Sequence, residues 1–153
     1  MNPSELHLAI NHLPVFSTLF GSIILMAGLI FKKDVLNLTA YLLIILGTLG
    51  AVFSAYTGEE AEELVEHYFP EVSHDLIHEH EEAAELARNL SIVLGILSLI
   101  ALFLNRTKRP LERIFGLLIL VGGIVGSTLL IRAAHTGGEI MHLEIRQDFE
   151  YSE

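Results

Sequence analysis

Histidine and carboxylate side chains recur at helical spacing in several segments of the chain. In residues 135–142, His135, Glu139 and His142 fall at positions i, i+4 and i+7, which places them on one face of a helix. Two further segments repeat this arrangement, and the region before the first apolar stretch adds a histidine. The predicted ligand pool drawn from these stripes is His12, Glu60, Glu63, His67, His78, Glu82, Glu85, His135, Glu139 and His142.

Imidazole and carboxylate together form a ligand set for transition metals. Iron, zinc and copper all accept it, and residue types alone do not choose among them. Glu139 and His142 also form a Glu-x-x-His pair, from which four-helix di-iron proteins build their sites together with carboxylates on other helices. The stripes therefore predict a site for one or two metal ions, di-iron included. His7, His74 and His80 fall off the stripes and are predicted to be bystanders.

The elements that must carry these residues are apolar helices. Of the 153 residues, 52% are hydrophobic, and several windows are long enough to cross a ~30 Å hydrocarbon core. Their middles are apolar nearly all round, unlike the apolar stripes of a soluble bundle. We predict an all-α protein, a single domain over residues 1–153 that forms an integral membrane four-helix bundle. The windows are 13–31, 35–56, 86–104 and 111–131.

The helical pattern continues beyond the apolar windows at one end of this bundle. Helices over 35–67 and 74–104 would exceed the hydrocarbon thickness by about 15–20 Å at 1.5 Å per residue. The fourth helix is expected to continue toward Arg146. Because each crossing reverses direction, all eight histidines and all nineteen acids except Asp34 and Glu112 should lie at this protruding end.

The first helix has two alternative forms, a bend at Pro14 or a restart with Asn11 as its cap. Residues 1–5 contain no basic region, and no small-residue cleavage site follows the first apolar run. We therefore expect this segment to be a retained membrane span rather than a cleaved signal peptide.

The basic residues predict how the bundle is oriented. They gather in the two short connections, and the positive-inside rule assigns that end to the cytoplasm. Both termini and the histidine-rich end are then extracytoplasmic. A net charge of −10 argues against nucleic acid as a partner, and the absence of cysteine excludes disulfides and c-type haem. The basic residues used here are Lys32, Lys33, Arg106, Lys108, Arg109 and Arg113.

Two arginines lie at the boundary between the apolar windows and the acidic segments. Arg88 and Arg132 could extend toward the membrane interface, pair with Glu85 and Glu139, or bind haem propionates. The sequence leaves these three roles open.

A short internal echo links the ends of the second and fourth windows. Residues 55–60 and 134–139 share Ala, Thr, Gly and Glu at equivalent places, which suggests two related helical hairpins.

Several motifs resemble those of an uncharacterised family of small four-span bacterial membrane proteins. They are His12-Leu13-Pro14 at the first span, Thr57-Gly58 after the second, histidines before the third, and Gly137-Gly138-Glu139 through His142 after the fourth. The resemblance implies a multi-pass protein of the bacterial inner membrane. Some relatives resemble fusions to electron-transfer domains, which implies redox work. The second outward segment of this chain is much more acidic than the family pattern.

Three functional hypotheses follow. The first is a membrane metalloprotein with a His/Glu site for a transition metal ion at the extracytoplasmic end, doing redox or metal-handling work. The second is a haem b electron-transfer protein, with His12 or His135 paired with His78 or His80. The third is a non-catalytic accessory subunit whose acidic face docks a soluble or membrane redox partner. Each is compatible with a lipid bilayer around the helices and with a homo-oligomer.

Overall fold

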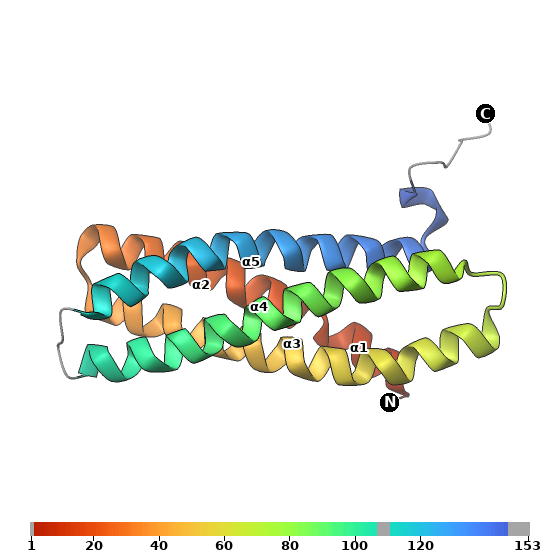
Figure 1. Ribbon diagram of the computed structural model, residues 1–153, viewed down its shortest axis with the longest axis horizontal. Coiled ribbons are helices and arrows are strands. Elements are labelled where there is room, and N and C mark those ends of the chain that lie inside the picture. Colours follow the sequence, from red (N-terminus) through yellow and green to blue (C-terminus); the bar gives the residue numbers. More distant parts are fainter. Residues whose placement is uncertain (1, 107–110, 147–153) are drawn as a thin grey trace.

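The protein is an all-α four-helix bundle, as the sequence predicts. The computed structural model describes residues 2–106 and 111–146, and within these ranges every regular element is a helix (Figure 1). The elements are α1 (Pro3–Ile10), α2 (His12–Phe31), α3 (Asp34–Tyr68), α4 (His74–Arg106), α5 (Leu111–Met141) and the short 3-10 helix η1 (Leu143–Ile145).

The long helices lie side by side in a ring. Helix α2 packs against α3 and α5, α4 packs against the same two helices, and α1 packs on α3 (Figure 1). Helices α2 and α4 are therefore diagonal to each other across the bundle. Four helical stretches are long and apolar enough to cross a membrane, which supports the prediction of a multi-pass membrane protein. They are Pro3–Phe31, Asp34–Tyr68, His74–Asn105 and Leu111–Met141.

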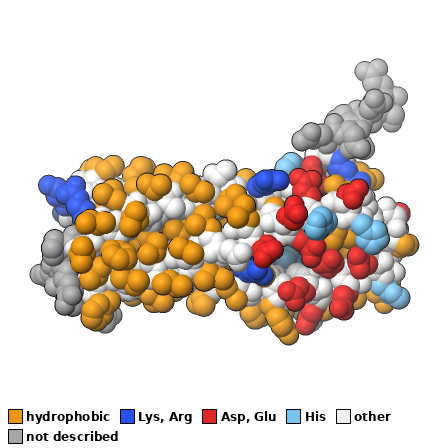
Figure 2. All heavy atoms as spheres, viewed as in Figure 1, with side chains coloured by type: hydrophobic (Ala, Val, Ile, Leu, Met, Phe, Trp, Pro, Cys, Tyr) orange, Lys and Arg blue, Asp and Glu red, His pale blue; other side chains and the backbone are white. Residues whose placement is uncertain are grey.

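The two ends of the bundle differ in charge. Hydrophobic side chains cover most of the visible face, while acidic and histidine side chains gather at one end and a group of basic side chains marks the other (Figure 2). We call the first the acidic end, and Lys32 and Lys33 in the α2–α3 turn mark the basic end. Lys108 and Arg109 lie outside the described residues. The acidic end consists of α1 with residues 57–68 of α3, 74–85 of α4 and 132–141 of α5.

Of the two forms predicted for the first helix, the structure has the division at Asn11, but the Asn11 side chain makes no capping hydrogen bond to α2. Asn2 caps α1, because its side chain accepts a hydrogen bond from the Glu5 N–H at 2.8 Å while the Glu5 carboxylate accepts one from the Asn2 N–H at 3.1 Å. Helix α2 begins after Asn11, and Pro14 falls in its first turn, where an N–H needs no partner within the helix. The helix carrying His7 therefore ends at Ile10, and it joins α2 through Asn11, whose own backbone is helical.

Small side chains let the helices approach closely. A Cβ atom at Gly47 would lie 2.9 Å from Thr18 Oγ1, and one at Gly95 would lie 2.6 Å from Thr48 Oγ1. These contacts join α2 to α3 and α3 to α4 by close packing. Toward the acidic end, buried Ala83 and Ala87 of α4 pack in one cluster with Leu130 and Ala133 of α5. Helix α4 is thereby held firmly against α5 where its protruding part begins.

The fourth long helix ends earlier than the sequence predicts. Helix α5 stops at Met141 rather than continuing toward Arg146, and η1 follows. The Arg146 guanidinium folds back and donates to the carbonyl oxygens of Glu139 at 2.7 Å and Ile140 at 3.0 Å. These carbonyls near the helix end thus gain a cationic partner in place of a further helical turn.

Candidate functional site

The predicted ligand pool lies on the outer surface of the acidic end. Every member is exposed except Glu139, whose side chain is only 13% exposed. His12 stacks on the exposed ring of Phe16 at 6.4 Å between centroids. The members are His12, Glu60, Glu63, His67, His78, Glu82, Glu85, His135, Glu139 and His142.

The stripes form as the spacing predicts, but they do not converge on one point. His78 Nε2 lies 3.4 Å from Glu82 Oε1, and His135 Nε2 lies 3.7 Å from Glu139 Oε1, each within one helix. His142 turns instead to Glu144, at 3.0 Å. In the described part of the chain, no three histidine, cysteine, aspartate or glutamate side chains gather as a metal site would require. Metal binding by this pool stays a prediction.

Of the two arginines at the base of the acidic end, one makes the ion pair that the sequence offered and the other does not. Arg88 Nη2 lies 3.5 Å from Glu85 Oε1, as expected. Pairing of Arg132 with Glu139, one of the roles left open, is not seen, because the Arg132 guanidinium reaches across from α5 to Glu79 of α4 at 3.6 Å. Glu139 pairs with His135 on its own helix.

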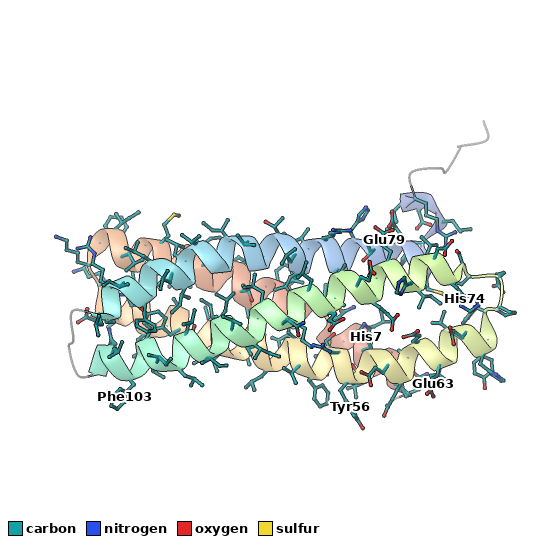
Figure 3. All side chains as sticks on the ribbon, viewed as in Figure 1. His7, Tyr56, Glu63, His74, Glu79 and Phe103 are labelled. Carbon is teal, nitrogen blue, oxygen red and sulfur yellow. The ribbon has the colours of Figure 1, made fainter. Side chains whose placement is uncertain are left out.

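The histidines that turn into the bundle are two that the stripes omit. Of the eight histidines, only His7 on α1 and His80 on α4 are half-buried, and the others are exposed. Figure 3 shows His7 in the interior of the acidic end, whereas Tyr56 and Glu63 of α3 point away from the bundle. The sequence-based prediction and the structure therefore select different histidines.

His7 is held against α3 by one hydrogen bond and one close approach. Its Nδ1 lies 3.0 Å from the carbonyl oxygen of Ser54 and 3.4 Å from Thr57 Oγ1. A carbonyl oxygen only accepts, so Nδ1 carries the hydrogen and Nε2 keeps a free lone pair. A Cβ at Gly58 would lie 3.3 Å from the ring carbon Cε1, so the glycine lets the ring approach the helix backbone.

His80 is held against α5 in the same way. Its Nδ1 lies 3.0 Å from the carbonyl oxygen of Ala133 and 3.3 Å from Thr136 Oγ1. A Cβ at Gly137 would lie 2.8 Å from its Cε1, closer than real Cβ contacts come. Here too the hydrogen is on Nδ1 and the Nε2 lone pair is free.

The internal echo in the sequence corresponds to these two histidine sites. Thr57 and Gly58 occupy the same places in their segment as Thr136 and Gly137 in theirs. Each Thr-Gly pair receives one imidazole from the preceding helical arm, so each hairpin of the bundle supplies one fixed histidine. The bundle thus presents two imidazoles with matching backbone anchors.

The surroundings of both imidazoles shift their pKa values in the same direction. Both lie outside the apolar windows, and burial lowers the pKa of each below the ordinary value of 6.5, against the opposing effect of its backbone hydrogen bond. A positive charge on His7 lowers the pKa of His80 further. Both rings are therefore neutral at pH 7, the form in which imidazole binds metals.

A carboxyl pair lies beside the histidine pair. Burial raises the pKa of Glu62 on α3, and the charge of Glu81 on α4 and a hydrogen bond to it raise the pKa further. Glu81 also acts electrostatically on His80. Glu62 is half-buried one helical turn beyond Gly58, whereas the Glu81 side chain is 52% exposed, so the carboxyl pair runs from the edge of the interior to the surface.

One sequence signal could have found His80. His80 shares a helical face with Ile77, Ala83 and Ala87, which are all buried, whereas the predicted ligands share faces with carboxylates. A histidine on the apolar side of an amphipathic helix points to the interior.

The comparisons with known proteins add nothing to this geometry. No protein-family model, curated protein or solved structure matches the chain. The resemblance to small four-span bacterial membrane proteins stays a prediction, and function has to be inferred from the acidic end itself.

Proposed function

We propose that His7 and His80 bind the iron of a b-type haem and that the protein transfers electrons at the acidic end. The observation that carries the proposal is the pair of imidazoles, each tied through Nδ1–H to a backbone carbonyl at 3.0 Å and each without a hydrogen bond at Nε2 among the described residues. A hydrogen bond of this kind behind the ring fixes the tautomer and orientation that a metal-ligating histidine needs.

The number of available ligands favours haem over a bare metal ion. A porphyrin supplies four nitrogens, so haem iron needs only two axial ligands from the protein. A zinc, iron or copper ion needs three or four donors, and the described residues hold no group of three. The haem hypothesis therefore moves ahead of the His/Glu hypothesis that composition favoured.

A bare iron, zinc or copper ion is the second candidate, on one specific observation. Glu81 interacts with His80 and hydrogen-bonds Glu62, so these two carboxyl groups are the nearest additional donors to the pair. A site of two imidazoles and one or two carboxylates would suit these metals.

The ligand-bearing helices differ in how they could admit a porphyrin. Helix α4 continues unbroken into its span, but α1 is a separate helix of eight residues that ends at Ile10. Outward movement of α1, which packs mainly on α3, would widen the space between His7 and His80. Arg88 and Arg132, at the base of the acidic end, are the cations available to haem propionates.

We further propose that the acidic end faces the extracytoplasmic side of a bacterial inner membrane. Lys32 and Lys33 at the opposite end support this orientation through the positive-inside rule. Both termini would then be extracytoplasmic. An acidic surface around the centre would attract a cationic redox partner by long-range electrostatics.

The test is an absorption spectrum and elemental analysis of the purified protein, expressed with haem precursor and separately loaded with haemin. The proposal expects a Soret band, about one iron per chain and the low-spin spectrum of two axial imidazoles. Stoichiometric zinc, copper or iron without a Soret band would support the second candidate instead. A folded protein that binds neither haem nor metal would contradict both.

A further inference from the structure

We infer that the lipid-facing side of α2 and α3 binds a membrane quinone. Its headgroup forms a hydrogen bond with His12 at the hydrocarbon boundary, and its isoprenoid tail lies along α2. The inference goes beyond the proposed centre, since it uses neither His7 nor His80. It rests on an apolar hollow, a strip of stacked rings and the charge of the acidic end.

An apolar hollow opens on this side of the bundle. Its volume is about 450 Å³, within the roughly 300–1,000 Å³ that is typical of small-molecule pockets. Most of its side chains are exposed on the outer face of α2 and α3, so the hollow opens toward lipid rather than toward the bundle interior. It is lined by Ile10, Leu13, Leu49, Gly50, Val52 and Phe53.

A strip of stacked rings runs beside the hollow on α2. The rings of His12 and Phe16 stack at 6.4 Å between centroids, and those of Phe16 and Phe20 stack at 6.0 Å. Phe16 follows Leu13 of the hollow by three residues, so the two are neighbours on the helix surface. Both phenylalanines are about half exposed, at 51% and 52%. The strip therefore offers an isoprenoid tail a continuous apolar surface that starts at an imidazole.

His12 is the polar group at the boundary end of this strip. It is exposed one residue before the apolar window 13–31, and the described residues give it a ring contact but no hydrogen bond or ion pair. A polar group at this depth is stabilised by a hydrogen-bonding ligand. A neutral imidazole has one donor and one acceptor nitrogen. His12 can therefore donate to the carbonyl oxygen of a quinone and accept from the hydroxyl of the quinol.

Charge favours a quinone over a phospholipid as the occupant. Most of the nineteen acidic residues belong to the acidic end, which repels the phosphate of a phospholipid headgroup (Figure 2). Arg88 and Arg132, the arginines at the base of this end, already face Glu85 at 3.5 Å and Glu79 at 3.6 Å. A quinone headgroup is uncharged and needs only the hydrogen bond that His12 offers.

The test is photolabelling of the full-length protein, without added haem, in phosphatidylethanolamine vesicles that contain an azido-benzoquinone with a decyl tail. We expect saturable labelling of peptides that include residues 10–20 or 49–53, identified by mass spectrometry. Unlabelled quinone and quinol should compete, whereas added phosphatidylglycerol should not. His12→Ala should weaken labelling about tenfold through loss of one hydrogen bond. His135→Ala, an exposed histidine on α5, should leave it unchanged.

A second pair of variants tests the hollow itself. Val52→Trp fills it from an exposed position and should weaken labelling about tenfold or more, whereas Val121→Trp, on the exposed face of α5, should not. Labelling that does not saturate, that phosphatidylglycerol abolishes, or that survives unchanged in both His12→Ala and Val52→Trp overturns the inference. Because no haem is present, failure of the protein to bind haem contradicts the proposed function and leaves this result standing.

Discussion

The acidic end contains two kinds of histidine, and they differ in what holds them. Surface histidines such as His78 and His135 face carboxylates on their own helix at 3.4 Å and 3.7 Å. Interior histidines His7 and His80 bond backbone carbonyls that are 47 and 53 residues away in the sequence. Exposed ion pairs of the first kind typically contribute about 0–1 kcal/mol and weaken with salt. The second kind fixes a ring in one orientation with a nitrogen left free, which is what a ligand site requires.

Substituting the interior histidines and the surface histidines in separate variants should give the largest difference in haem binding. We expect His7→Ala and His80→Ala to weaken haem binding by more than the roughly 10–100-fold cost of losing a hydrogen-bond partner behind a ligand. The matched control is the double variant His135→Ala/His142→Ala, both exposed, which should retain full haem content. Haem titration followed by absorbance measures the affinity of each variant. Loss of haem in the control alone would show that the surface histidines are the haem ligands.

Substituting the glycine beside each interior histidine should show how the two histidine sites differ in packing. Gly137→Ala places a Cβ 2.8 Å from the His80 ring, and Gly58→Ala places one 3.3 Å from the His7 ring. Both variants gain up to about 1 kcal/mol of helix propensity, so their difference isolates the ring contact. We expect Gly137→Ala to be the less stable by about 1–3 kcal/mol in free energy of unfolding, measured by denaturation in detergent. Equal stabilities, or the reverse order, would show that the rings are not seated as described.

The apo-protein should show the smallest of these effects, a loss of stability in mild acid. Burial lowers the pKa of both His7 and His80 in the folded state. These two histidines therefore bind protons at a higher pH in the unfolded chain than in the folded protein. The free energy of unfolding should be highest above about pH 6.5 and should fall as the pH drops below that value. Unfolding midpoints between pH 7.5 and 5.5, compared with those of His7→Gln/His80→Gln, measure this. If the double variant keeps the full pH dependence, other groups account for it.

Composition was enough to predict the helices of this protein but not all of their ends. The apolar windows predict four long helices because a run of about twenty apolar residues has few alternatives to a membrane span. The break at Asn11 was one of two alternatives, and choosing between them required the packing of α1 on α3. The end of α5 at Met141 depends on the guanidinium of Arg146, which returns to the helix from beyond it.

The candidate site was harder to predict because its decisive contacts are not local. Spacing within one helix finds His135 and Glu139, which do pair. It cannot find His7 against Ser54 or His80 against Ala133, because those contacts exist only once two helices are packed together. The repeated Thr-Gly segment was visible in the sequence, but its role in receiving a histidine required the structure.

Chemical rescue by imidazole tests the central claim most directly. His80→Gly should lose bound haem and its low-spin spectrum, and added imidazole should restore both by occupying the space beside Gly137 and replacing the missing ligand. His135→Gly should need no rescue. If His80→Gly keeps the wild-type spectrum without imidazole, or if only His135→Gly responds to it, the buried pair is not the centre.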